Sequence, residues 1–87
     1  MAQVSREKDM KVTLARIGET LYEGEAYSLT VPGVAGVMTI LSRHMPLVST
    51  LKKGTVFVRE EKDGPQKEFQ IENGIIEFSG DSATVLL

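Results

Sequence analysis

Apolar and polar residues alternate in two segments of this 87-residue chain. Residues 10–15 show the pattern first, with Val12 and Leu14 on one face and polar or small side chains between them. Residues 67–72 repeat it around Phe69. A period of two residues is typical of a strand with one buried face. No window sustains the 3.6-residue period of an amphipathic helix, so the pattern predicts an all-β protein.

The remaining strand candidates are short runs rich in apolar and β-branched residues, separated by residues that favour turns. These candidates are residues 21–24, 26–31, 36–41, 47–51, 55–59, 75–78 and 83–87. The predicted turns lie at Gly18, Gly24, Pro32–Gly33, Gly54, residues 60–66, Asn73–Gly74 and residues 79–82. Short strands with a turn every ~8 to 12 residues predict a β-sandwich or a β-barrel.

The chain length predicts one domain, which we place over residues 10–87 after a flexible leader at residues 1–9. A domain of this size buries roughly 60 to 65% of the surface of its unfolded chain. Eight inward-facing side chains are expected to brace its core. They are Val12, Leu14, Val56, Val58, Phe69, Ile71, Phe78 and Val85.

Composition excludes several classes of protein. The formal net charge is −2, whereas a small nucleic-acid-binding protein normally has a clear basic excess. The absence of cysteine excludes disulfides, thiolate zinc sites and cysteine nucleophiles, and it favours a reducing compartment. No apolar run reaches the roughly 18 residues of a membrane span, and the polar N-terminus lacks the core of a signal peptide. These features predict a soluble, cytoplasmic protein.

The single histidine, His44, is the natural candidate for acid–base chemistry. Ser42 and Ser49 lie close to it, but no acidic residue occurs between Ala26 and Glu60 to orient the ring. A hydrolase would therefore need a carboxylate brought in from a distant strand. One histidine without cysteine also leaves few ligands for a metal ion. We expect no catalytic residue, no metal and no cofactor.

Two other patterns are typical of ligand-binding sites. The glycines at Gly33 and Gly36 suggest a phosphate loop, but neither the Lys nor the helix of such a loop follows. Lys52, Lys53 and Arg59 suggest a basic patch, so a small single-stranded nucleic-acid-binding β-barrel stays the alternative function. The three phenylalanines, however, alternate with polar residues as core positions do.

Apolar residues also occur in or beside predicted turns, where polar residues are expected. These residues are Val34, Ala35, Val37 and Met45. Any that stay exposed mark a surface for another protein. The sequence therefore favours an interaction module over an enzyme.

Several segments, taken in order, resemble the N-terminal β-sandwich domain of the epsilon subunit of F-type ATP synthases. The segments are Leu-Tyr-Glu-Gly at 21–24, Leu-Thr-Val-Pro-Gly at 29–33, Gly-Val-Met-Thr-Ile-Leu at 36–41, His-Met-Pro-Leu at 44–47, Leu-Lys-Lys-Gly at 51–54, Asn-Gly-Ile-Ile-Glu at 73–77 and Ala-Thr-Val-Leu at 83–86. The resemblance covers about residues 11–87 and implies a flattened two-sheet β-sandwich of short, mostly antiparallel strands. The sequence has no counterpart of the helical hairpin that usually follows this domain in the family.

The family's role implies a central-stalk rotor subunit, not catalytic on its own, that couples rotation of the c-ring to the gamma subunit. The resemblance implies a peripheral location on the cytoplasmic face of the inner membrane, and an isolated chain that is soluble and monomeric. The c-ring side would be formed by Gly33, Ala35, Gly36 and Val37, and the gamma side by Arg43, His44 and Met45.

Two departures from the family pattern affect these surfaces. The family often has Glu-Gly-Glu where this chain has Ala35-Gly36-Val37, so carboxylates on the ring side are lost. The Pro-Gly that precedes the family's histidine is Ser42-Arg43 here, which alters the turn and adds a cation. The ring contact should therefore be more apolar than in the family, or the ring should carry matching changes.

Overall fold

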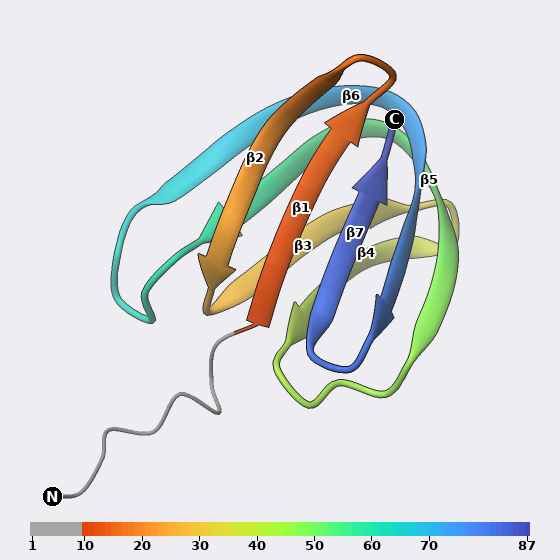
Figure 1. The fold of residues 1–87 in the computed structure, drawn as a ribbon. Helices are drawn as coiled ribbons and strands as arrows, with labels where there is room; N and C mark the ends of the chain where they lie inside the picture. Colours follow the sequence, from red (N-terminus) through yellow and green to blue (C-terminus); the bar gives the residue numbers. More distant parts are fainter. Residues whose placement is uncertain (1–9) are drawn as a thin grey trace, which may run out of the picture.

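A computed structural model describes residues 10–87 of the chain, and within this range it contains strands and no helix. The strands are β1 (Met10–Arg16), β2 (Glu19–Ala26), β3 (Ser28–Gly33), β4 (Gly36–Leu41), β5 (Leu47–Arg59), β6 (Gln66–Ser79) and β7 (Ser82–Leu86) (Figure 1). The leader predicted over residues 1–9 lies outside the described residues. In the part of the chain from residue 10 on, no helix could span a membrane.

The seven strands form one hydrogen-bonded sheet in the order β2-β1-β7-β6-β5-β3-β4. Neighbouring strands are antiparallel except β1 and β7, which run parallel. The long strands β5 and β6 arch from the layer of β1, β2 and β7 to the layer of β3 and β4 (Figure 1). The prediction of an all-β sandwich of mostly antiparallel strands is confirmed. Its two layers are joined through β5 and β6 into one continuous sheet.

The turns predicted at Gly54 and at Asn73–Gly74 are wrong, because β5 and β6 run through both positions. These glycines instead permit close approach of neighbouring chain segments. A Cβ atom on Gly54 would lie 2.9 Å from Cβ of Pro32, and one on Gly74 would lie 2.8 Å from the carbonyl oxygen of Leu86. Both distances are shorter than real Cβ atoms tolerate. At both positions glycine is needed because the neighbouring segment leaves no room for a side chain, and the local sequence does not reveal this cause.

The turn predicted at Pro32–Gly33 is also displaced. Strand β3 continues through Gly33, and the chain reverses at residues 34–35, before Gly36 with its φ of +141°. Pro32 fits within the strand because the ladder between β3 and β5 is interrupted there, so its missing N–H breaks no bond. The short segment predicted to close at Gly24 is likewise part of a longer strand, β2. The turns predicted at Gly18, 60–66 and 79–82 are confirmed.

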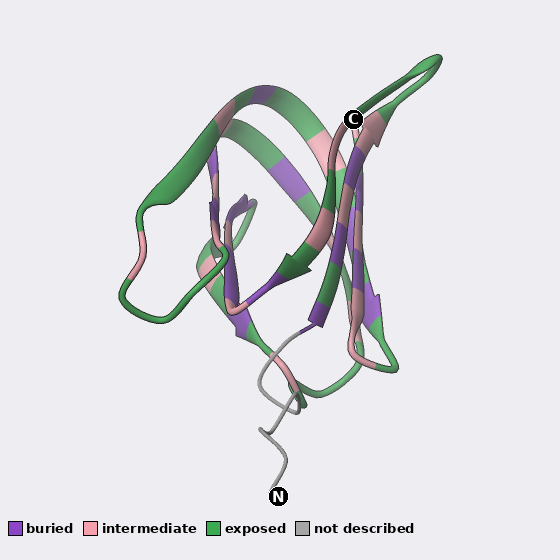
Figure 2. Cartoon of the chain, turned by 60° about the vertical axis from the view of Figure 1, so that its left-hand side comes forward, coloured by how far each residue is buried: buried purple, intermediate pink, exposed green. Residues whose placement is uncertain are grey.

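The core lies between the two layers. Buried positions alternate with more exposed ones along β1 and β7, whereas β3 is buried at nearly every position (Figure 2). Of the eight core positions predicted, all but Phe69 are buried. Phe69 is half-buried at the edge of the core, where its ring meets Tyr22 edge-on at a centroid distance of 6.1 Å. This contact places Phe69 beside β2, an edge strand of the sheet. The core prediction therefore fails at one position, and the reason is its place at the rim.

A polar link joins the two layers next to this rim. The Tyr22 hydroxyl on β2 donates a hydrogen bond to Oε2 of Glu60, directly after β5, at 2.5 Å. Burial of the phenol, its bond to Glu60 and the charge of that carboxylate raise the pKa of Tyr22 well above its ordinary value. The edge strand β2 is thereby tied to the opposite layer, which stiffens the open side of the sandwich.

Candidate partner-binding site

The hairpin between β3 and β4 presents an apolar tip, defined here as residues 33–37. Gly33 is buried at the end of β3, whereas residues 35–37 are exposed. Val34 is 55% exposed and Val37 is 73% exposed. The structure thus brings together the residues predicted for the ring side, with Gly33 supporting the tip from beneath instead of contributing surface.

Positive charge adjoins this tip. The Val34 amide donates to the carbonyl of Thr50 at 3.0 Å, which fixes the tip beside β5. Lys52 and Lys53 follow on that strand, and both are exposed. Strands β3 and β4 and the tip contain no acidic residue. The surface therefore combines exposed valines with two lysines, a combination suited to an apolar partner surface that also carries acidic groups.

The second predicted surface is the corner between β4 and β5, defined here as residues 42–46. Arg43, His44 and Met45 are exposed, with Met45 at 77%. The His44 ring meets Phe78 edge-on, with centroids 5.9 Å apart. Its Nδ1 lies 2.7 Å from the carbonyl oxygen of Met45. Because a carbonyl oxygen only accepts, this contact requires the proton on Nδ1.

This arrangement fixes His44 in place and gives it no carboxylate partner among the described residues. A general base of the triad type is oriented by an acidic group and reaches a nucleophile. Here a backbone carbonyl and an aromatic edge perform the orienting. The ring is therefore suited to contact with another protein.

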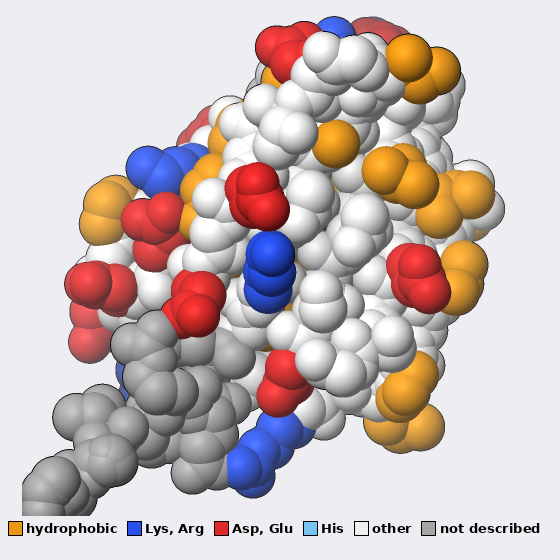
Figure 3. All heavy atoms as spheres, viewed as in Figure 1, with side chains coloured by type: hydrophobic (Ala, Val, Ile, Leu, Met, Phe, Trp, Pro, Cys, Tyr) orange, Lys and Arg blue, Asp and Glu red, His pale blue; other side chains and the backbone are white. Residues whose placement is uncertain are grey.

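A third apolar surface was missed by the sequence analysis. We call it the stripe, and it consists of Val48, Ile75 and Leu86, which are 70%, 46% and 55% exposed. Ile75 pairs directly with Leu86 across β6 and β7. In Figure 3 apolar side chains gather along the right-hand side of the molecule, the side of β5, β6 and β7 in Figure 1.

The stripe is continuous with the corner. Pro46, Val48 and Glu77 line the same shallow hollow, of about 260 Å³. The signal for the stripe was present in the sequence as adjacent apolar pairs, at 47–48, 75–76 and 86–87. Since successive strand residues face opposite sides of a sheet, one member of each such pair must point away from the core.

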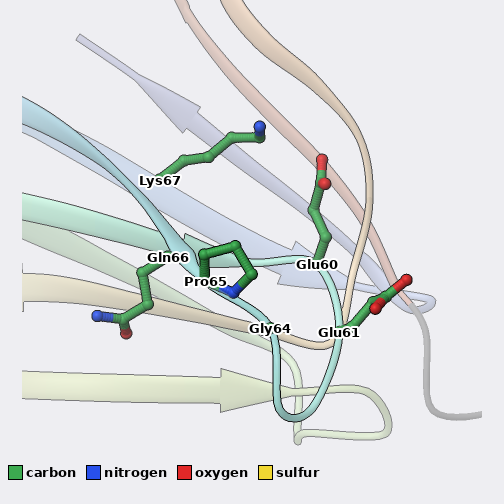
Figure 4. A pocket seen from close by; sticks show the side chains of 6 residues that line it. All are labelled: Glu60, Glu61, Gly64, Pro65, Gln66 and Lys67. Atoms are coloured by element: carbon green, nitrogen blue, oxygen red, sulfur yellow. The ribbon is translucent and has the colours of Figure 1, made fainter.

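A polar hollow of about 420 Å³ lies at the β5–β6 hairpin. It is lined by Glu60, Glu61, Gly64, Pro65, Gln66 and Lys67. Figure 4 shows the Gln66 and Glu61 side chains pointing away from each other, so the polar groups do not converge on one centre. No group of three or more potential metal ligands is present within residues 10–87. This hollow is an open hairpin loop without the geometry of a reactive site.

The basic patch considered from the sequence does not assemble. Arg59 is half-buried and donates to the carbonyl of Gly64 within the β5–β6 hairpin. Lys52 and Lys53 lie at the middle of β5, six or seven residues away, which is roughly 20 Å along a strand. Single-stranded nucleic acid needs a continuous basic groove with stacking aromatics. The described surface offers no such groove along β5.

Residues 9–87 match the family described as ATP synthase, Delta/Epsilon chain, beta-sandwich domain. An ATP synthase epsilon chain from Chlorobium limicola is 34% identical over 82 residues, which cover 94% of this chain and 92% of that protein. One from Leptospira interrogans is 38% identical over 77 residues, covering 88% of this chain and 59% of that protein. ATP synthase epsilon chain 2 of Burkholderia orbicola is 29% identical over 77 residues.

The aligned part covers 51% of the Burkholderia protein, so this chain spans about half the length of that relative. Among solved structures, a chain of the Euglena gracilis mitochondrial ATP synthase matches with a TM-score of 0.84 at 18% identity, covering 98% of this chain and 54% of its own length. A chain from the central stalk and c-ring of the Tetrahymena thermophila mitochondrial ATP synthase matches with a TM-score of 0.72 at 15% identity, with 94% and 65% covered. These two matches show the same fold.

Proposed function

Since the chain belongs to the family of ATP synthase delta/epsilon chain β-sandwich domains, we propose that it is a central-stalk subunit of an F-type ATP synthase. In this role it makes and breaks no bonds. It couples rotation of the c-ring to the gamma subunit through protein–protein contacts. The observation that carries the proposal is the exposed apolar surface formed by the stripe and the corner on one rigid sheet.

The gamma subunit binds the corner and the stripe together in this proposal. Contiguous exposed apolar surface on a small domain is characteristic of a protein interface. Met45 and Val48, which are 77% and 70% exposed, supply apolar anchors, and Glu77 supplies a polar rim. The fixed His44 ring adds a flat contact whose orientation is set before binding.

The c-ring binds the tip. Val34 and Val37 contact its polar loops, and Lys52 and Lys53 lie where acidic groups of the ring would approach. The tip carries no carboxylate of its own, so salt bridges with basic ring residues play no part in this contact. We propose instead a small apolar contact flanked by ion pairs from β5.

Stiffness suits the chain to transmit torque between these partners. The pairing of β5 with β6 runs from Leu47 opposite Phe78 to Arg59 opposite Gln66, and it connects both layers. The layers are further linked by the bond between Tyr22 and Glu60. A close-packed interior has low compressibility and passes on strain. A load applied at the tip therefore reaches the corner without being absorbed by a soft element.

The subunit acts on the cytoplasmic face of the inner membrane. We propose that it is held there through the complex and not by insertion into lipid. In isolation we expect a soluble monomer, as the family resemblance implies.

Co-expression with the gamma subunit of the same ATP synthase tests this function. The wild-type chain should co-elute with gamma in size-exclusion chromatography. Val48→Lys places a charge in the centre of the interface and should abolish co-elution, while the melting temperature changes little because Val48 is exposed. Gln70→Lys is the matched control. Gln70 is exposed and lies near the start of β6, away from the stripe, so this variant should leave the complex intact. A wild-type chain that elutes alone would refute the proposal.

A further inference from the structure

Two residues other than glycine have positive φ angles in the described chain, Arg43 at +68° and Asp81 at +57°. This backbone region is unfavourable for most L-residues, although aspartate tolerates it better than arginine does. The two residues come from different turns, and they touch. The Arg43 amide donates a hydrogen bond to Oδ1 of Asp81 at 2.6 Å, across 38 positions of sequence.

Asp81 is itself anchored on the sheet. It lies in the turn between β6 and β7, which closes with the pair Ser79 and Ser82. Its carbonyl oxygen accepts a hydrogen bond from the Lys11 amide at the start of β1, at 3.0 Å. One residue thus joins β1, the β6–β7 turn and the corner. A carboxylate that accepts from a backbone N–H forms a stronger bond than a neutral acceptor does.

The corner depends on such a bond because it lies outside the sheet ladders. Strand β4 ends at Leu41 and β5 begins at Leu47, so residues 42–46 belong to no strand. Within the corner the His44 amide donates to the Leu41 carbonyl at 3.1 Å, a local bond that closes the turn on itself. The bond from Arg43 to Asp81 ties the backbone of this turn to a distant turn of the sheet, and the edge contact of the His44 ring with Phe78 adds a tie to β6.

We propose that Asp81 is a positioning residue for partner binding. By holding the Arg43 amide, its carboxylate keeps the corner in the one conformation that presents His44 and Met45 beside the stripe. The inference rests on the proposed function, since the partner concerned is the gamma subunit. Pre-ordering a loop raises affinity because less conformational entropy is lost on binding. The unfavourable φ of Arg43 is maintained by this bond.

Three variants separate the bond from the backbone angle. Asp81→Asn keeps an acceptor oxygen and a residue that tolerates positive φ. Asp81→Gly relieves the backbone but removes the acceptor, and Asp81→Ala loses both. Hydrogen exchange of the Arg43 amide in the isolated chain reports the bond, and calorimetric titration with gamma reports the affinity.

We expect Asp81→Gly to accelerate Arg43 exchange and to weaken gamma binding, each by about tenfold, the effect of one hydrogen bond to a charged group. Asp81→Asn should remain within about threefold of wild type in both measurements. A purely structural turn would give the opposite order, because glycine is the better residue at positive φ.

Three results would overturn the proposal or part of it. Unchanged Arg43 exchange in Asp81→Gly would show that the bond does not order the corner. Wild-type affinity in Asp81→Gly, despite faster exchange, would show that the order is irrelevant to binding. A wild-type chain that fails to bind gamma would refute the proposed function, and Arg43 exchange alone would then decide the ordering role of Asp81.

Discussion

Ile75 and Ile76 are neighbours on β6 with the same side chain, and they face opposite sides of the sheet. Ile76 is fully buried, whereas Ile75 is 46% exposed. Replacing each by alanine in turn removes the same atoms and the same β-branched propensity. The difference between the two variants therefore isolates burial. It also tests the register of β6, because a slip of one residue would exchange their environments.

The magnitudes follow from the burial. Ile76→Ala removes three carbon atoms from the core, worth about 2.4 kcal/mol at about 0.8 kcal/mol each. If about 40 Å³ of cavity remains, it adds about 1 kcal/mol, for a total near 3.5 kcal/mol. For Ile75→Ala about half the transfer free energy applies and no cavity forms, which gives about 1 kcal/mol. We therefore expect the free energies of unfolding of the two variants to differ by about 2.5 kcal/mol.

Urea denaturation at pH 7 measures both variants against wild type. Ile76→Ala should also lower the melting temperature by about 14 to 28 °C, given about 4 to 8 °C per kcal/mol for a domain of this size. Equal destabilisation, or a larger effect at Ile75, would refute the register and with it the assignment of Ile75 to the stripe. The slope of the urea transition should be the same in all three proteins, since none of the changes alters the area exposed on unfolding substantially.

Three further predictions concern the rim and the bends of the sheet. Because the pKa of Tyr22 is raised in the folded chain, the unfolded chain loses this proton at a lower pH. The contribution of Tyr22 to the free energy of unfolding is therefore constant below about pH 10 and falls as the pH rises above it. Urea titrations at pH 8 and pH 10.5 measure this loss of stability, and Tyr22→Phe should make it smaller. Tyr27→Phe is the control for removal of a tyrosine hydroxyl elsewhere. A loss of stability in Tyr22→Phe equal to that of wild type would contradict the link to Glu60. Gly74→Ala should cost about 1 to 3 kcal/mol by calorimetry, because its Cβ would lie 2.8 Å from the Leu86 carbonyl, and a neutral result would mean that the bend relaxes freely. Phe69→Ala should lower the free energy of unfolding by roughly half of the ~3 to 5 kcal/mol expected for a fully buried phenylalanine, because the ring is only half-buried. A loss of the full size in urea denaturation would show that Phe69 is a core residue.

Local sequence patterns correctly predicted those elements whose residues are not constrained by close contact with another segment of the chain. Strand β1 and the hairpin around Gly64 follow from alternation and turn residues alone. The failures at Gly54 and Gly74 share one cause. Both glycines are required by a neighbouring strand that is distant in sequence, and a local reading assigns them to turns.

The candidate site was predictable in part. Apolar residues in loops, together with the family resemblance, indicated the tip and the corner. The stripe was missed because its members lie within strands, where an apolar residue is expected to be buried. The contact between Arg43 and Asp81 could not be predicted, since it joins two turns 38 positions apart and depends on how the corner finally lies against the β6–β7 turn.

The most direct test of a purely mechanical role compares two activities of the complete ATP synthase in inverted membrane vesicles. One is ATP hydrolysis and the other is ATP-driven proton pumping. With Val48→Lys in this subunit, we expect hydrolysis to persist while the number of protons pumped per ATP falls at least severalfold. With Gln70→Lys we expect both activities to stay unchanged. Undiminished pumping per ATP in Val48→Lys, in vesicles where the subunit no longer binds gamma, would contradict the mechanical role.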